Sequence, residues 1–223
     1  MLLLAVDTSG KHGSIALARC GLEDACEVLE VAALPGGTFS AELIPQIAVL
    51  LDRHGFSKAE IGAFAVVSGP GSFTGLRIGM AVIKALAEVL AKPIVAVSLL
   101  EAVAAASHSR GKIKAAIEAG RNEIFLGEYD AGSDGTHLIR ERLFARDQWL
   151  ESARDSLIVT PDNALAEAAR VHGLRVVEVE RPLGDAIARL GWRKIASGET
   201  VSPEALDANY IGRSEAELFV KGG

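Results

Sequence analysis

Two segments of the chain carry residue types that could bind a phosphate group or a metal-bound water. Asp7, Thr8 and Ser9 follow an apolar run, and residues 68–79 have the glycine-rich sequence SGPGSFTGLRIG. A carboxylate can hold a metal-bound water. Glycine lets another group come close to the backbone, and a helix that begins after such a turn favours an anion. The residues of this candidate nucleotide or phosphate site are Asp7, Thr8, Ser9, Gly69, Gly71 and Ser72.

The alternative is that both segments only form tight turns, in which such residues are common. The glycine-rich segment is not a P-loop, because the first lysine after it is Lys84, and its glycine spacing differs from the dinucleotide fingerprint. Ser72 follows Gly71 directly, so the segment also lacks the Gly-x-Ser-x-Gly pattern of a serine nucleophile. We therefore expect Ser72 or Thr74 to cap a helix rather than to react.

The sequence predicts neither a metal site nor a catalytic residue in this chain. No two of the five histidines have the spacing of a helical metal pair, and Cys20 and Cys26 lack partners at zinc spacing. Trp149 and Trp192 lie in stretches with helical patterning, where packing is the expected role of an indole ring.

A strand before the glycine-rich segment and a helix after it must position that segment. Residues 63–67 are apolar, and residues 80–91 have helical spacing. Residues 2–6 and 14–18 predict a hairpin whose turn contains Asp7, and residues 27–34 predict a third strand. Ligands bind at the carboxyl ends of strands in open α/β sheets, which is where both segments lie. A helix from about Ser40 to Gly55, a strand at 94–97 and a helix at 99–106 complete this half.

The second half of the chain repeats part of this pattern. Residues 117–121, followed by a strand over 123–129, resemble residues 6–10 followed by the strand at 14–18. A duplicated unit is therefore expected. Further strands are predicted at 157–160 and 175–179, and helices at 148–153, 164–171 and 182–197. The polar break at 107–111 predicts domains 1–107 and 108–223, with a tail that could return to the first domain.

The helix after the glycine-rich segment is apolar over most of its circumference. One stripe contains Leu76, Met80, Ile83 and Ala87, and a second contains Ile78, Val82, Leu86 and Val89. A helix that covers one sheet needs an apolar arc of only about 100°. This helix is therefore expected to be buried on two sides, with either another helix or another chain on the second side.

Composition narrows the class of protein. The 223 residues include 23 Lys and Arg against 29 Asp and Glu, a net charge of −6, so the chain by itself is a poor candidate for binding nucleic acid. Two cysteines are too few for a disulfide framework, and reduced thiols are expected. Neither a signal peptide nor a membrane span is predicted, and a cytoplasmic location is expected.

Together, Asp7-Thr8-Ser9, the glycine-rich segment and the tail sequence NYIGRSEAE at 209–217 resemble the TsaB (YeaZ) family. The resemblance implies an α/β fold of two related actin/Hsp70/sugar-kinase-like (ASKHA) domains, each a mixed sheet with helices. It implies a role in making N6-threonylcarbamoyladenosine (t6A) at position 37 of tRNA. It also implies a noncatalytic subunit that pairs with a TsaD-like transferase and a TsaE-like ATPase, forms a homodimer when alone, and meets tRNA only through the complex.

The resemblance further assigns residues. The catalytic relative has a His-x-x-x-His metal site on the helix after its third strand, but residues 38–45 contain no histidine here. No tightly bound cofactor is expected, the Asp7 site is expected to be vestigial, and ATP or ADP could bind at the complex interface. Gly212 stands where the family tail usually has arginine. The expected partner interface consists of Phe39, Leu43, Ile47, Leu50, Leu76, Met80, Ile83 and Ala87.

Two other classes remain open on the sequence. One is an active ASKHA-type phosphotransferase of small molecules, although Glu118 in the second hairpin is not followed by a Gly-Thr or Gly-Ser turn. The other is a metallopeptidase, which would need metal ligands that the sequence does not provide at recognisable spacing.

Overall fold

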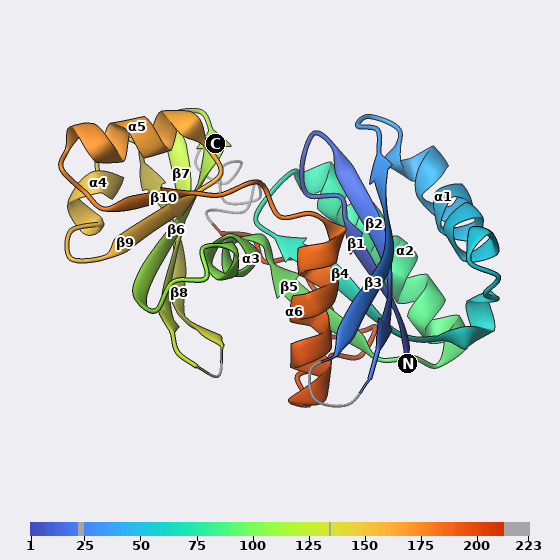
Figure 1. Ribbon diagram of the computed structural model, residues 1–223. Helices are drawn as coiled ribbons and strands as arrows, with labels where there is room; N and C mark the ends of the chain where they lie inside the picture. Colours follow the sequence, from blue (N-terminus) through green and yellow to red (C-terminus); the bar gives the residue numbers. More distant parts are fainter. Residues whose placement is uncertain (22–24, 134, 212–223) are drawn as a thin grey trace. The chain divides into compact units, whose positions relative to one another are not determined.

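The computed structural model describes residues 1–21, 25–133 and 135–211, and the chain divides into two compact units (Figure 1). Unit 1 comprises Met1–Leu99 and Pro182–Ala208, and unit 2 comprises Leu100–Arg181 and the residues from Asn209 onward. Each unit contains a five-stranded mixed sheet. No helix in the described ranges combines the length and apolarity needed to cross a lipid bilayer.

The sheet of unit 1 has the strand order β3-β2-β1-β4-β5. β2 pairs antiparallel with both β1 and β3, whereas β1, β4 and β5 run parallel to one another. The strands are β1 (Leu2–Asp7), β2 (Gly13–Cys20), β3 (Cys26–Leu34), β4 (Ile61–Gly69) and β5 (Ile94–Ser98). The helices of this unit are α1 (Phe39–Arg53), the 3-10 helix η1 (Lys58–Glu60), α2 (Phe73–Leu90) and α6 (Gly184–Ala196).

The sheet of unit 2 has the order β10-β9-β6-β7-β8. β7 pairs antiparallel with β6 and β8, and β6, β9 and β10 are parallel. The strands are β6 (Gly111–Gly120), β7 (Glu123–Ala131), β8 (Thr136–Ala145), β9 (Leu157–Thr160) and β10 (Val176–Glu178). The helices are α4 (Trp149–Ser152), α5 (Asn163–Val171) and α3 (Leu99–Ala106), whose first residue belongs to unit 1.

The two sheets have the same connectivity, because β6, β7, β8, β9 and β10 occupy the positions of β1, β2, β3, β4 and β5. The predicted duplication is therefore correct, and its hairpins are β1–β2 and β6–β7. The predicted fold class, two related ASKHA-like α/β units, is confirmed. β8 is a strand that the sequence reading missed, and most of its residues are exposed or only half buried.

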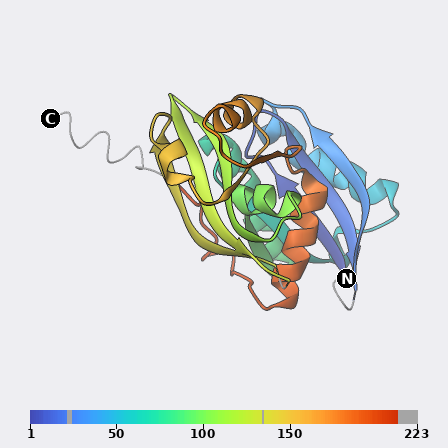
Figure 2. The same ribbon diagram turned by 60° about the vertical axis from the view of Figure 1, so that its left-hand side comes forward.

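Helices cover both faces of the unit 1 sheet. In Figures 1 and 2, α6 lies across one face, and α1 and α2 lie on the other. Ala16, Ala5 and Ala65 are paired in register across β2, β1 and β4, so they form a row of small side chains on one face. Two glycines of α6 lie directly over this row. A Cβ on Gly184 would be 2.9 Å from the Ala16 Cβ, and one on Gly191 would be 2.5 Å from the Ala65 Cβ.

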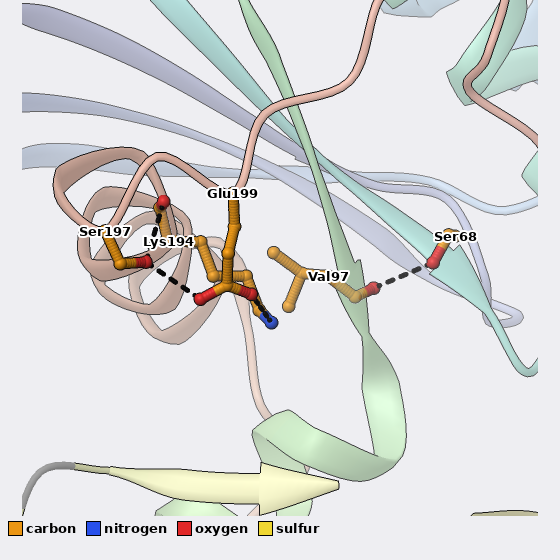
Figure 3. Close-up of polar contacts among 5 residues, drawn as sticks. All are labelled: Ser68, Val97, Lys194, Ser197 and Glu199. Atoms are coloured by element: carbon orange, nitrogen blue, oxygen red, sulfur yellow. Dashed lines mark hydrogen bonds and ion pairs between the residues drawn. The ribbon is translucent and has the colours of Figure 1, made fainter.

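This helix changes the predicted domain division. Residues 182–208 belong to unit 1, whereas the sequence reading placed all of 108–223 in the second domain except for a tail that could return. The chain also leaves unit 1 at Leu99, before the predicted boundary at 107. The physical reason is that the glycine face of α6 fits the alanine row of the unit 1 sheet. The sequence composition does not change where the chain leaves unit 1 after Leu99 or where it returns at Pro182. At the C-terminal end of α6, the side chains of Lys194 and Ser197 both donate hydrogen bonds to the carboxylate of Glu199 (Figure 3).

Unit 2 has its own core. Trp149 is 1% exposed and packs with a cluster of small and aliphatic residues that includes Ile124, Leu126, Ile158 and Leu165. The predicted packing role of Trp149 is therefore correct. The indole N–H of Trp192, in unit 1, is buried without a hydrogen-bond partner among the described residues.

The contact between Gly191 and Ala65 predicts an unusual response to alanine. Alanine normally stabilises a helix by about 1 kcal/mol relative to glycine. Because the new Cβ would be 2.5 Å from that of Ala65, we expect Gly191→Ala to destabilise the protein by about 1–3 kcal/mol in urea unfolding. Adding Ala65→Gly should recover about 1 kcal/mol or more as an interaction energy. A stabilising effect of Gly191→Ala alone would contradict this packing.

Candidate functional site

The structure brings the two predicted segments together at the carboxyl ends of β1 and β4. The backbone N–H of Ser72 donates to the carbonyl oxygen of Ser9 at 2.7 Å. The Thr8 hydroxyl donates to the carbonyl oxygen of Gly75 at 2.7 Å, and the Ser9 N–H donates to Asp7 Oδ1 at 2.8 Å. These polar groups therefore form hydrogen bonds within the loop after β1 and between that loop and the start of α2.

Glycines make this close approach feasible. Gly71, Gly75 and Gly79 are spaced four residues apart, so Gly75 and Gly79 lie on one side of α2 and Gly71 on the turn before it. A Cβ on Gly71 would be 2.3 Å from the Ser9 carbonyl oxygen, and one on Gly75 would be 2.1 Å from the Thr8 carbonyl oxygen. A Cβ on Gly79 would be 2.3 Å from Thr8 Oγ1. The sequence reading expected another group to approach the glycines, and that group is the chain's own loop.

The remaining residues of the candidate site support the same turn. Ser72 caps α2, since its hydroxyl accepts a hydrogen bond from the Gly75 N–H at 3.2 Å. Gly69 has φ of 137°, a backbone conformation that favours glycine. Ser68, just before it, donates to the Val97 carbonyl oxygen at 3.4 Å, which ties the end of β4 to β5 (Figure 3).

Burial limits what these groups can do chemically. Asp7 is 2% exposed, Thr8 is 1% exposed and Ser9 is 2% exposed. A ligand could reach the hydroxyl of Thr8 or the N–H of Ser9 only if the loop separated from α2. In this conformation the three residues act as a structural joint between β1 and α2.

A cavity of about 560 Å³ lies beside this joint, and Asp7, Thr8 and Ser9 are not among the residues lining it. Sequence reasoning did not identify its walls, apart from Ser72 and neighbouring positions of α2. The Pro35-Gly36-Gly37 break could have indicated one wall, because Gly36 lies against the backbone of Lys11 and the space beside Gly37 is open. The lining residues are Gly10, Lys11, His12, Gly36, Gly37, Phe39, Ser40, Ser72, Thr74, Gly75 and Ile78.

The residues predicted to form the partner interface are buried within the single chain. None is more than 7% exposed: Phe39, Leu43, Ile47, Leu50, Leu76, Met80, Ile83 and Ala87. α1 contacts β2, β3 and α2, and α2 contacts β1, β4 and β5, so these stripes face the interior of unit 1. The prediction that this set contacts a partner directly is therefore corrected. The sequence reading found both stripes of α2 but chose the one that faces the sheet.

The opposite sides of α1 and α2 are exposed. Apolar side chains form much of this surface, and Arg77 and Glu88 of α2 are exposed on it as well. On α1 the exposed positions recur at helical spacing and end in Asp52 and Arg53, and Ile44 is 59% exposed and Val49 48% exposed. On α2, Val89 is 79% exposed, while Val82 and Leu86 are half buried. We define the α1/α2 outer face by the exposed apolar residues on these sides, which are Ala41, Ile44, Pro45, Ala48, Val49, Ala81, Ala85 and Val89.

The site and fold define an ASKHA-like α/β protein in which the glycine-rich turn is packed against the β1 loop. The family model described as "TsaD: tRNA N6-adenosine threonylcarbamoyltransferase" matches residues 36–178. The solved structure "YeaZ from Pseudomonas aeruginosa" superposes with a TM-score of 0.73 at 26% identity, over 93% of this chain and 100% of that one. The chain belongs to the family of this model, and its similarity to YeaZ and to curated TsaB proteins confirms the predicted TsaB (YeaZ) resemblance.

Curated relatives carry the same group name. "tRNA threonylcarbamoyladenosine biosynthesis protein TsaB" of Escherichia coli is 27% identical over 228 residues, which is 97% of this chain and 96% of that protein. The protein of the same name from Haemophilus influenzae is 28% identical over 79% of this chain and 71% of its own length. The Bacillus subtilis protein is 36% identical over 58% of this chain and 55% of its own length.

Part of the predicted tail motif lies outside the described residues. Asn209, Tyr210 and Ile211 are described, whereas Gly212 and the residues after it are not. The amide of Asn209 donates to Glu141 Oε2 of β8, in the same unit.

A threonine pair tests the structural role of the joint. Thr8→Val removes the hydroxyl that donates to Gly75 but keeps the shape of the side chain, so we expect a loss of about 1 kcal/mol of unfolding free energy. Thr74→Val, at an exposed position of the first turn of α2, serves as the control and should change stability by less than about 0.5 kcal/mol. Equal effects of the two substitutions in urea unfolding would contradict the assignment.

Proposed function

We propose that this chain is a noncatalytic subunit required for t6A biosynthesis, which acts by pairing with a TsaD-like transferase subunit through the α1/α2 outer face. The observation that carries the proposal is the apolar character of that face. A surface helix normally turns polar side chains toward solvent. Between residues 41 and 49 of α1 every exposed position is apolar, and the exposed polar residues Ser40, Asp52 and Arg53 lie at the ends of the helix. The apolar positions are Ala41, Ile44, Pro45, Ala48 and Val49.

Burial of this face in a complex would be favourable. Removing apolar surface from water contributes roughly 25 cal/mol per Å². Ile44 and Val89 are the most exposed large apolar side chains on their helices, at 59% and 79%. The small side chains of Ala81 and Ala85, which are exposed on α2, would let a second pair of helices approach closely.

A structurally related partner fits this surface best. A subunit of the same family would carry the same two adjacent helices, and pairing like surfaces about a pseudo-twofold axis gives a four-helix layer. The same geometry predicts a homodimer when the partner is missing. The names of the curated relatives, and the transferase named by the matching family model, support t6A biosynthesis as the process.

The joint between β1 and α2 supports a noncatalytic role. In this conformation Asp7, Thr8 and Ser9 contact the chain's own backbone rather than an open pocket, so they are not placed to bind a nucleotide. Residues 38–45, on the helix where the transferase resemblance would put a His-x-x-x-His site, contain no histidine. Recruitment of a TsaE-like ATPase, binding of ATP or ADP at the complex interface, and contact with tRNA only through the complex stay predictions. The net charge of −6 agrees with the last of these.

A matched pair of substitutions tests the surface. Val89 on α2 and Val171 on α5 are 79% and 77% exposed, so glutamate at either position should leave the fold intact. Val89→Glu would bury a charge against the partner, and we expect it to weaken binding of the TsaD-like subunit at least about 100-fold, measured by titration calorimetry. Val171→Glu should leave the affinity within about twofold.

The same variants test the cellular role. In cells depleted of the native protein, expression of Val171→Glu should restore t6A in tRNA, as measured by nucleoside mass spectrometry. Val89→Glu should not restore it, although the variant chain accumulates to the same level. Normal t6A with Val89→Glu, or in depleted cells without complementation, would refute the proposal.

A further inference from the structure

Two cysteines face each other at the end of the β2–β3 hairpin, in a part of unit 1 that the joint and the outer face do not use. Cys20 and Cys26 are partners in the strand register, and their Sγ atoms are 3.3 Å apart. Cys20 is buried and Cys26 is partly exposed. Both thiols are reduced in this structure.

The backbone hydrogen bonds show which kind of strand pair the cysteines form. The N–H of Cys20 donates to the Met1 carbonyl oxygen, and the Cys20 carbonyl oxygen accepts from the N-terminal ammonium group. Both backbone groups of Cys20 therefore point toward β1 and away from β3. Cys20 and Cys26 thus form a non-hydrogen-bonded antiparallel pair, in which the Cα atoms are about 4.5 Å apart. That separation lies inside the range that a disulfide can bridge.

The surroundings favour a thiolate on Cys26. The hydrogen bond from the Cys20 thiol lowers the pKa of Cys26, and the positive charge of Arg189 on α6 lowers it further, against the opposing effect of burial. Arg189 also donates to the Cys26 carbonyl oxygen at 2.9 Å, which holds the guanidinium group beside the pair. The hydrogen bond to Cys26 raises the pKa of Cys20 above its ordinary value, and burial raises it further. One thiol is thus activated and the other keeps its proton.

We propose that Cys20 and Cys26 form a site of reversible oxidation, at which a peroxide closes a disulfide that joins β2 to β3. The Cys26 thiolate attacks one peroxide oxygen, the O–O bond breaks, hydroxide leaves, and Cys26 becomes a sulfenic acid. The Cys20 sulfur then attacks the Cys26 sulfur as it loses its proton. The S–S bond forms, the S–O bond breaks, and the departing hydroxide takes up a proton as water.

The overall step balances. Two thiols lose two electrons and two protons, and one hydrogen peroxide is reduced to two waters. The hydrogen bond and the thiolate charge that keep Cys20 protonated disappear once Cys26 is oxidised, which frees Cys20 to resolve the intermediate. A dithiol reductant would reverse the closure by thiol–disulfide exchange.

The test uses the purified full-length chain with hydrogen peroxide, followed by alkylation under denaturing conditions and intact-mass and peptide mass spectrometry. We expect both thiols to be lost together in a monomeric product that is two hydrogen atoms lighter and contains a Cys20–Cys26 cross-linked peptide. Dithiothreitol should restore both alkylation sites. Over-oxidation of Cys26 to a sulfinic acid while Cys20 stays alkylatable would overturn the proposal, as would a disulfide formed only between chains.

Single substitutions assign the two roles. In Cys20→Ser, peroxide should give a Cys26 sulfenic acid that dimedone traps, since the resolving thiol is gone. In Cys26→Ser, the buried Cys20 should react at least about tenfold more slowly than Cys26 does in Cys20→Ser. Equal rates in the two variants, with melting temperatures matching that of the unmodified chain, would contradict the proposed roles.

Discussion

The close contact between α2 and the loop after β1 fixes much of unit 1. Thr8 packs against the side of the helix that has no side chains at Gly75 and Gly79, and Ser9 packs against Gly71 in the turn before the helix. Hydrogen bonds from Thr8 and Ser72 hold the two segments together. This contact sets the rotation of α2 about its own axis. Leu76, Ile83 and Ala87 consequently point into the core, and Ala81, Ala85 and Val89 point outward. Gly71, Gly75 and Gly79 therefore close the candidate ligand site, and the resulting orientation of α2 exposes the surface that we assign to a partner.

Much of this architecture could be predicted from the sequence because its signals are local. Apolar runs bounded by polar turns identified β1, β2, β4 and their counterparts, and the repeated hairpin pattern indicated the duplication. β8 was missed because its residues include Arg140, Glu141 and Arg142 and are mostly accessible to solvent, so hydrophobic periodicity carries little signal for this edge strand. The place of α6 was missed for a different reason. The fit of Gly184 and Gly191 to a row of alanines depends on residues far away in the sequence.

At the candidate site, too, the sequence predicted the local structure but not the contacts between distant segments. Glycine spacing correctly indicated a close approach and a capped helix, but it could not tell whether the approaching group was a ligand or the chain itself. Similarly, hydrophobic spacing revealed two stripes on α2, yet nothing in the spacing alone says which one faces the sheet. Burial of Leu76 and Met80 and exposure of Val89 answer that question, and they move the expected contact surface by about half a turn of the helix.

Hydrogen–deuterium exchange of this chain with and without a purified TsaD-like subunit would test the central claim most directly. The account predicts a complex in which slowed exchange is concentrated in peptides from α1 and α2, with little change in peptides from β6 to β10. Absence of a complex at micromolar concentrations, or protection located in unit 2 with α1 and α2 unchanged, would contradict it.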